Sequence, residues 1–502
     1  MAPIRQVRRP WMDAAHSSGD ELMTMVAHRI DARRPGADGP LGPGVERVHL
    51  VGIGGAGMEG LARLLDAMGY RVTGSDVSEG PVIEDLRRSG IAVFHGHDAA
   101  HTRAADLLIH SAAIPESNPE RQAASSAGIR QFRRAAALGL LSRGYDTVAV
   151  AGTHGKTTTA SLIAAALHGA GRQPTIAVGG WVNGQTQSAA GAGNLMVVEA
   201  DEYDRSFLEL EPWLAVVTNI EMEHVDCYAD EAELLEAFVA FLGRTRADGC
   251  VIINGDDPLC TQVLERVRGL DDFRTSRVIT FGFTDGCDVR ASDLHKAAGG
   301  ISFDCEDAKG SRRLSLRIPG RHNVANALAA CTAARALGLD PGAVGVALAG
   351  FAGVDRRFQQ RGQFGGVQVV DDYAHHPTEV AATLAAARQQ MGHSRRLVAV
   401  LQPHTYTRTK RFHADFSRVL AAADSAWVTA VYAAREEPGD GVQSDVIVSE
   451  LQARGADAHW EADVDHALRA ALDSCDVGDW LVVMGAGDIG VRLDALLVER
   501  GA

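Results

Sequence analysis

The sequence predicts an α/β protein built from three successive domains. Its 502 residues correspond to about three domains at ~100–200 residues each. Short apolar strands alternate with helical segments along most of the chain, which is typical of doubly wound sheets. Glycine-rich turns join a strand to a helix in three places: GIGGAG (residues 52–57), GTHGKT (152–157) and GAGDIG (485–490).

The bulk composition narrows the class of protein. A hydrophobic fraction of 46% and a charged fraction of 23% fit a soluble globular chain. The net charge of -15 argues against a nucleic-acid partner. No apolar run approaches the ~18 residues of a membrane span. The 7 cysteines are scattered and form no C-x-x-C, which favours reduced thiols and a cytoplasmic location.

Residues 1–45 are rich in arginine, proline and glycine. This composition predicts a mobile N-terminal tail with at most a short helix over residues 22–30. The sequence does not indicate what the tail does.

The first domain is expected over residues 46–145. A strand runs into Gly52, Gly54 and Gly57, and a second strand ends at Asp76. This is the G-x-G-x-x-G pattern with an acid about 20 residues on, which fits a dinucleotide site. A tight turn that needs glycines only for packing explains the pattern equally well.

The second domain is expected over residues 146–319 and opens with a shortened phosphate loop. Gly155, Lys156 and Thr157 supply the G-K-T of the P-loop, but Val150 occupies the place of the leading glycine. Between a strand and a helix, such a loop can bind a triphosphate through backbone N–H groups and Lys156, while Thr157 ligates Mg²⁺. The alternative is a connector with a solvated lysine.

Two further strands of this domain end in polar residues. Glu199 ends one strand and is the best candidate for a Mg²⁺ ligand, whereas the acids of residues 201–204 could form a solvated turn. His224 follows the next strand and could contact a metal or phosphate, or be structural. No H-E-x-x-H or Cys/His spacing appears, so a structural zinc is not expected. Residues 288–320 are typical of β-hairpins.

The third domain is expected over residues 320–502. It opens with a helix and then alternates strands and helices in a second doubly wound pattern. Polar clusters follow its strands at residues 371–376 and 404–408. The GAGDIG run is interpreted as a compact turn.

Taken together, the motifs resemble the Mur ligase family, and within it the members that attach L-alanine. The matching stretches are GIGGAGMEG, GTHGKTTT, EADEYD, TNIEMEHVD, IPGRHNVANALAA, FAGVDRRFQQRG, DDYAHHPTE, QPHTYTRT and MGAGDIG. The resemblance covers the chain from about residue 47 onward. It also accounts for the shortened loop, because G-T-H-G-K-T-T is the form that the ATP-binding loop takes in this family.

The resemblance implies an N-terminal Rossmann-like UDP-binding domain, a central P-loop ATPase-like domain and a C-terminal Rossmann-like domain. It implies that ATP, with Mg²⁺, activates UDP-N-acetylmuramate as an acyl phosphate that L-alanine attacks, in peptidoglycan precursor synthesis. The oligomeric state is not indicated.

The resemblance also implies a set of site residues. The catalytic residues are Lys156, Glu199, His224 and Arg357, and the metal ligands are Thr157, Glu199 and His224. The ATP site comprises Gly152, Thr153, His154, Gly155, Lys156, Thr157, Thr158, His322, Asn323, Asn326, Arg357 and Asp372. The UDP-sugar site comprises Gly52, Gly54, Gly55, Gly57, Met58, Asp76 and Ser111. The amino-acid site comprises Tyr373, His375, His404 and Arg408.

Three positions depart from the alanine-adding pattern. Thr405 stands where an arginine is usual, Tyr203 where serine is common, and Glu223 where aspartate is commoner. The tyrosine form also resembles the related ligase that recycles a tripeptide onto the same sugar nucleotide. Outside the ligases, an NAD(P)-dependent oxidoreductase and a catalytically inactive nucleotide-binding scaffold are the alternatives.

Overall fold

The structure, a computed structural model, describes residues 39–182, 185–224, 227–271, 273, 275, 277–297, 299–391, 395–434, 436 and 443–501. Most of the predicted tail, including its short helix, lies outside the described residues. The chain divides into two compact units. One comprises the residues up to Asp146 with Ala190–Met196, and the other comprises the rest. The described residues contain no helix with the length and apolar character of a bilayer span.

The first unit contains a five-stranded parallel sheet in the order β3-β2-β1-β4-β5. Its strands are β1 (Arg47–Val51), β2 (Arg71–Asp76), β3 (Ala92–His95), β4 (Leu107–His110) and β5 (Arg130–Arg133). Its helices are α2 (Ala56–Ala67), α3 (Pro81–Arg88), η2 (Ala99–Thr102), α4 (Pro119–Ser126) and α5 (Arg134–Ser142). This is the doubly wound arrangement expected from the alternating pattern.

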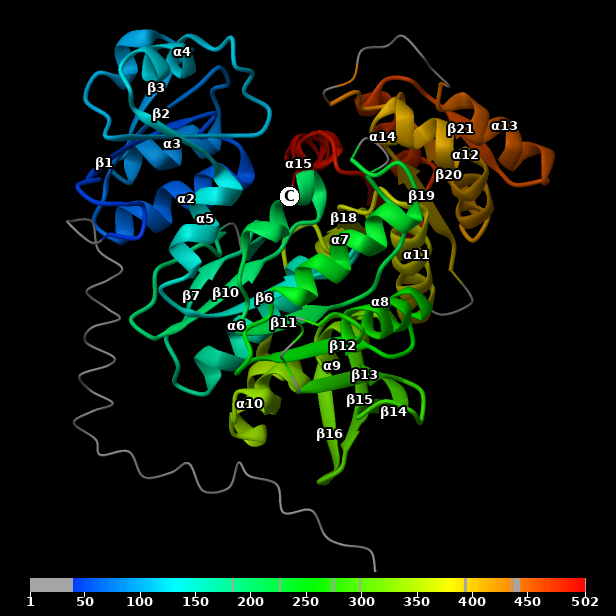
Figure 1. Cartoon of the computed structure of the whole chain (residues 1–502). Helices are drawn as coiled ribbons and strands as arrows, with labels where there is room; N and C mark the ends of the chain where they lie inside the picture. The colour runs from blue at the N-terminus through cyan, green and yellow to red at the C-terminus, as the bar shows by residue number, and fades with distance from the viewer. Residues whose placement is uncertain are drawn as a thin grey trace, which may run out of the picture. The chain divides into compact units, whose positions relative to one another are not determined.

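The second unit contains two large sheets (Figure 1). The nine-stranded sheet has the order β16-β15-β14-β13-β12-β11-β6-β10-β7. Its strands are β6 (Asp146–Ala151), β7 (Thr175–Ala177), β10 (Leu195–Glu199), β11 (Leu214–Val217), β12 (Cys250–Asn254), β13 (Val278–Gly282), β14 (Val289–Ala297), β15 (Gly300–Asp307) and β16 (Gly310–Leu316). Strands β14 to β16 pair antiparallel, as the hairpin prediction required.

Helical segments connect these strands, and a two-stranded ribbon lies apart from the sheet. The helices are α6 (Lys156–Gly169), η3 (Tyr203–Glu209), α7 (Glu231–Gly243), α8 (Pro258–Arg268), α9 (Arg321–Ala336) and α10 (Pro341–Gly350), and the ribbon is β8 (Trp181–Val182) with β9 (Gln185–Thr186). Helices α9 and α10 both pack against α6. The domain boundaries, including the one at residue 320, stay a prediction.

The third sheet has the order β17-β18-β22-β19-β20-β21 and is parallel except for β17. Its strands are β17 (Gln359–Phe364), β18 (Val367–Asp372), β19 (Leu397–Leu401), β20 (Ser425–Val428), β21 (Ala458–Trp460) and β22 (Trp480–Met484). Its helices are α11 (Pro377–Met391), α12 (Tyr406–Leu420), α13 (Asp445–Ala453), α14 (Val464–Asp473) and α15 (Ile489–Glu499).

Alternate residues of this sheet enter separate apolar cores. Val370 and Val482 belong to one cluster, and their neighbours Val369 and Val483 to another. Successive strand residues point to opposite faces, so both faces are covered. Polar side chains are thereby left for the strand ends, where the candidate site residues lie.

Candidate active site

The shortened loop turns tightly between β6 and α6. Gly152 has φ 129° and Gly155 has φ 82°, a region that favours glycine. A Cβ atom at Gly152 would collide with the Thr218 hydroxyl, and one at Gly155 with the Asn326 side chain. The two glycines therefore allow both the turn and close packing, and Val150 lies within the strand instead.

Lys156 begins α6 and is held by the loop and by an acid. Its ammonium donates to the Gly152 carbonyl at 2.7 Å and to Glu202 Oε2 at 2.8 Å. Burial opposes the charge, but Glu202 and Asp201 keep the pKa of Lys156 above its usual value. The lysine therefore carries a full positive charge at the start of a helix, where anions bind favourably.

The next residue, Thr157, is paired with the strand-end acid. Its hydroxyl donates to Glu199 Oε1 at 2.6 Å, and the other oxygen of Glu199 accepts from the Gly179 backbone at 3.0 Å. One hydroxyl and one carboxylate next to a phosphate site are the ligands that Mg²⁺ prefers.

His224 lies in a different group of side chains from Thr157 and Glu199. Its Nε2 is 3.6 Å from Glu202 Oε1, and ligand atoms of His224, Asp201 and Glu202 lie within 4.8 Å of one another. Burial disfavours its charge, yet Glu202 and Glu223 raise the pKa of His224. The three-residue set Thr157, Glu199 and His224 stays a prediction.

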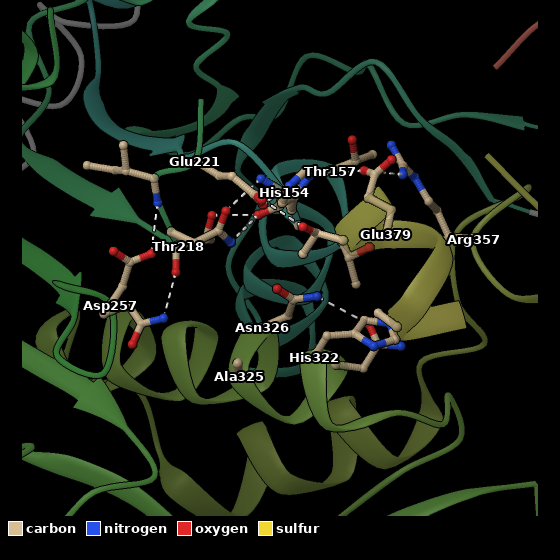
Figure 2. A pocket seen from close by; sticks show the side chains of 18 of the residues that line it. His154, Thr157, Thr218, Glu221, Asp257, His322, Ala325, Asn326, Arg357 and Glu379 are labelled. Atoms are coloured by element: carbon tan, nitrogen blue, oxygen red, sulfur yellow. Dashed lines mark hydrogen bonds and ion pairs between the residues drawn. The ribbon is translucent and has the colours of Figure 1, made fainter. Parts of the chain in front are cut away.

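A pocket of ≈ 640 Å³ extends from this loop (Figure 2). Nine of the twelve residues predicted for ATP line it: His154, Gly155, Thr157, Thr158, His322, Asn323, Asn326, Arg357 and Asp372. Apolar groups at one part of the lining, among them Phe281 and Leu259, suit the face of a base, while the loop offers backbone donors for phosphates.

The consecutive residues Arg356 and Arg357 contact different partners. Arg356 donates to the Gly485 carbonyl at 2.6 Å and so holds the GAGDIG turn. Arg357 lines the pocket, and its guanidinium lies 3.6 Å from Glu379. Asp372 accepts from the backbone of Phe358 and Ala374, and burial raises the pKa of Asp372 to about 6.

The predicted amino-acid residues form a continuous chain of contacts. The Tyr373 and His375 rings lie 5.4 Å apart, and those of His375 and His404 lie 5.7 Å apart. Arg408 Nη1 is 3.0 Å from His404 Nδ1, and its Nη2 is 2.7 Å from Glu223. The structure thus brings all four residues together and adds Glu223 to them.

The predicted UDP-sugar residues all lie in the first unit, at the carboxyl ends of β1, β2 and β4 and in the first turn of α2. Asp76 accepts from the Gly54 backbone at 2.8 Å and fixes the glycine turn. Strand β1 lies between β2 and β4, so the turn is at a topological switch point, where ligands bind in such sheets.

Four acids of the site were not assigned roles from the sequence: Glu202, Glu221, Glu223 and Glu379. Glu379 contacts His154 at 3.3 Å and also the His375 backbone at 3.0 Å. Burial disfavours the charged form of His154, but Glu221 and Glu379 raise the pKa of His154 to about 10. All four acids lie inside the motifs that carry the family resemblance. Membership of those motifs was the sequence signal that could have identified them.

Three family models match the chain in order. They are described as Mur ligase family, catalytic domain (residues 47–146), Mur ligase middle domain (150–334) and Mur ligase, glutamate ligase domain (356–487). Together they cover most of the chain.

Whole-chain comparisons agree with these matches. The UDP-N-acetylmuramate–L-alanine ligase of Thermobifida fusca is 41% identical over 90% of this chain and 96% of its own length. That of Kineococcus radiotolerans is 42% identical over 92% and 100%. The structure of the Thermotoga maritima UDP-N-acetylmuramate-alanine ligase has a TM-score of 0.76 at 28% identity, over 90% and 98%. A murein peptide ligase of Psychrobacter arcticus has a TM-score of 0.66 at 24% identity, over 91% and 99%.

Proposed function

The chain belongs to the Mur ligase family, and from this membership we propose that it is the ATP-dependent ligase that joins L-alanine to UDP-N-acetylmuramate. The product is UDP-N-acetylmuramoyl-L-alanine, with ADP and phosphate. The reaction belongs to peptidoglycan precursor synthesis, and we place it in the cytoplasm.

The first step is transfer of the γ-phosphoryl group of ATP to the carboxylate of the sugar. Such transfer depends on positioning and charge neutralisation more than on a protein nucleophile. Lys156 at the start of α6 and Arg357 in the pocket wall would contact the β- and γ-phosphates. Both cations are needed because the attacking carboxylate and the phosphate are anions that repel each other.

Thr157 and Glu199, with His224 as a further candidate, would hold Mg²⁺, which when bound neutralises charge on the phosphate oxygens. The hydrogen bond between Thr157 and Glu199 supports this assignment, because it brings two oxygen ligands to the phosphate end of the pocket. Asn323 and Asn326 would contact the adenine and Asp372 the ribose.

In the second step the amine of L-alanine attacks the acyl phosphate, and phosphate leaves. Arg408 would bind the carboxylate of L-alanine, since a guanidinium can bind it through two parallel hydrogen bonds. His404 would orient this arginine, and His375 and Tyr373 would complete the lining of the amino-acid site. The glycine turn after β1 would bind the UDP group.

One observation carries the proposal: a single pocket combines the P-loop with residues of α9, α11 and the loop before β17. The test is phosphate release from ATP with Mg²⁺ and UDP-N-acetylmuramate, for each amino acid in turn, with the product identified by mass spectrometry. Release that requires L-alanine and yields the alanyl product supports the proposal. No release with any acceptor would refute it.

The tripeptide-adding ligase is the second candidate. Tyr203 favours it, and the Tyr203 ring lies edge-on to His224 at 5.1 Å. The alanine-adding hypothesis is favoured by two relatives named UDP-N-acetylmuramate–L-alanine ligase, at 41–42% identity. The same assay with the tripeptide L-alanyl-γ-D-glutamyl-meso-diaminopimelate as acceptor separates the two.

A further inference from the structure

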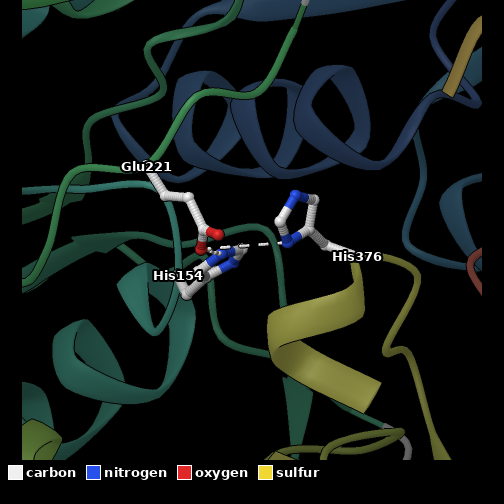
Figure 3. A group of neighbouring side chains, drawn as sticks. All are labelled: His154, Glu221 and His376. Atoms are coloured by element: carbon white, nitrogen blue, oxygen red, sulfur yellow. Dashed lines mark hydrogen bonds and ion pairs between the residues drawn. The ribbon is translucent and has the colours of Figure 1, made fainter. Parts of the chain in front are cut away.

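Three metal-ligating side chains converge at the nucleotide pocket, and two of them, His154 and Glu221, line it (Figure 3). His154 Nε2 lies 2.9 Å from Glu221 Oε2, and His376 Nδ1 lies 3.8 Å from the same oxygen. All three ligand atoms lie within 4.8 Å of one another. None of these residues belongs to the expected Mg²⁺ set of Thr157, Glu199 and His224.

Two of the three side chains are oriented by a second partner. The far nitrogen of His154, Nδ1, is 3.3 Å from Glu379 Oε1. The far oxygen of Glu221, Oε1, accepts from the Thr378 hydroxyl at 2.8 Å. Outer partners of this kind fix the orientation of metal ligands in proteins, and a carboxylate is one of the usual partners of a metal-bound histidine.

His376 is the third member and is buried, with 1% of its surface exposed. Its ring packs edge-on against Phe412 at 4.7 Å, and its Nδ1 accepts from the backbone N–H of Thr378 at 3.4 Å while facing Glu221. Its Nε2 has no hydrogen-bond partner in the described part of the chain. A protonated His154 between Glu221 and Glu379 would explain two of the contacts. The Thr378 N–H orients the second imidazole, and it leaves two acceptors, His376 Nδ1 and Glu221 Oε2, facing each other at 3.8 Å.

We propose that His154 Nε2, Glu221 Oε2 and His376 Nδ1 bind a transition-metal ion of the zinc class, with a fourth position open to water. Two imidazoles and one carboxylate suit Zn²⁺ and Co²⁺, whereas Mg²⁺ prefers oxygen ligands alone. The ligands come from the P-loop, the loop after β11 and the residue before α11, so their sequence spacing matches no zinc motif. The ion would tie α11 to the P-loop at the wall of the pocket, where His154 also belongs to the expected ATP site.

The test uses Co²⁺ as a spectroscopic probe of the full chain, with Mg²⁺ in large excess to occupy oxygen-rich sites. We expect one Co²⁺ per chain with the strong visible bands of four-coordinate cobalt, and displacement by Zn²⁺. His376→Ala and Glu221→Gln should each weaken binding by about tenfold or more, and Glu379→Gln should weaken it by about tenfold through the lost outer partner.

Two histidine variants serve as matched controls. His224→Ala alters the other histidine–carboxylate group, and His413→Ala alters a partly buried histidine that contacts Glu450. Both should retain the Co²⁺ spectrum and affinity of the unsubstituted chain. Circular dichroism checks folding, and Glu379→Gln tests the same site if His376→Ala does not fold. Unchanged Co²⁺ affinity in the His376 and Glu221 variants, or the weak bands of six-coordinate cobalt, would overturn the proposal.

Discussion

The guanidinium of Arg408 donates a hydrogen bond of 2.7 Å to Glu223, a residue 185 positions away in the sequence. Burial favours the neutral acid, but the charges of His375 and Arg408 hold the pKa of Glu223 at about 2. The arginine expected to bind the substrate carboxylate therefore already has an anionic partner. A zwitterionic amino acid offers a carboxylate to Arg408 and an ammonium to Glu223, so the pair suits both of its charged ends.

Replacing Arg408 by alanine should raise the KM for L-alanine by about tenfold or more, since charge-assisted hydrogen bonds contribute about 1.5–3 kcal/mol each. The KM for ATP should change little, because Arg408 does not line the nucleotide pocket. Initial rates at varied L-alanine and ATP concentrations measure both. Arg411→Ala, an exposed arginine on the same helix, is the control. An unchanged KM for L-alanine would remove Arg408 from the amino-acid site.

Lys156→Ala should reduce turnover by about 10³-fold or more, because phosphoryl transfer depends on cations that neutralise the developing charge. The substitution also leaves Glu202 without its ammonium partner. Affinity for UDP-N-acetylmuramate, measured by calorimetry, should remain close to that of the unsubstituted chain, because the predicted sugar-nucleotide residues lie in the other unit. Turnover at the unsubstituted rate would contradict the role of Lys156.

Thr157 allows a matched pair of substitutions at the expected magnesium site. Thr157→Ser keeps the hydroxyl that contacts Glu199, whereas Thr157→Val keeps the shape and removes the oxygen. We expect the valine variant to need about tenfold more Mg²⁺ for half-maximal activity and the serine variant to behave as the parent. A magnesium titration of phosphate release measures this. Equal titration curves for the two variants would exclude the Thr157 hydroxyl as a ligand.

Much of the fold could be predicted because its signals are local. Apolar runs placed β6 and β10, and the glycines of the loop placed the turn into α6. The antiparallel strands β14 to β16 also followed from the pattern. The short strands β8 and β9 did not, because two-residue ribbons leave no period to detect.

The candidate site could be predicted only in part, because its contacts join distant segments. The Lys156–Glu202 and Arg408–Glu223 pairs cross 46 and 185 positions, and periodicity carries no information on such distances. Motifs supplied the residues that are predicted to meet the substrates. The acids that hold these residues, such as Glu379, became visible only from the packing of α11 beside the P-loop.

A buried acid in the first unit should make stability depend on pH. Glu120 is fully buried, accepts from Ser75 at 2.6 Å and lies 2.6 Å from His101 Nδ1. Burial raises its pKa, but His49, Ser75 and His101 together lower the pKa of Glu120 from 4.5 to about 2. A lowered folded-state pKa stabilises the protein above pH 4.5, and this contribution is lost as the pH falls toward 2.

The contribution is on the order of 3 kcal/mol at neutral pH. Glu120→Gln should therefore lower the Tm at pH 7, and its difference from the parent should shrink below pH 4.5. Thermal melts from pH 3 to pH 7, followed by circular dichroism, test this. Glu116→Gln, at a carboxylate 95% exposed, is the control and should show almost no difference at any pH. A Glu120→Gln difference that does not vary with pH would contradict the assignment.

Thr405 stores backbone strain next to the amino-acid residues. Its φ of 64° with ψ of 143° is a conformation that β-branched residues avoid, at a cost of about 1–3 kcal/mol. Glycine adopts it freely but loses about 0.5–1 kcal/mol in chain entropy. Thr405→Gly should therefore stabilise the protein by about 1 kcal/mol and raise the Tm by a few degrees at most. Thr407→Gly, within α12, should lower the Tm instead, because glycine in a helix costs about 1 kcal/mol and the hydrogen bond from the Thr407 hydroxyl to Glu436 is lost. Thr405 directly follows His404 and begins the turn that carries Arg408. Because relief of the strain at Thr405 would change the positions of these two residues, it should also raise the KM for L-alanine. A Tm for Thr405→Gly at or below that of the parent would show that the residue is not strained.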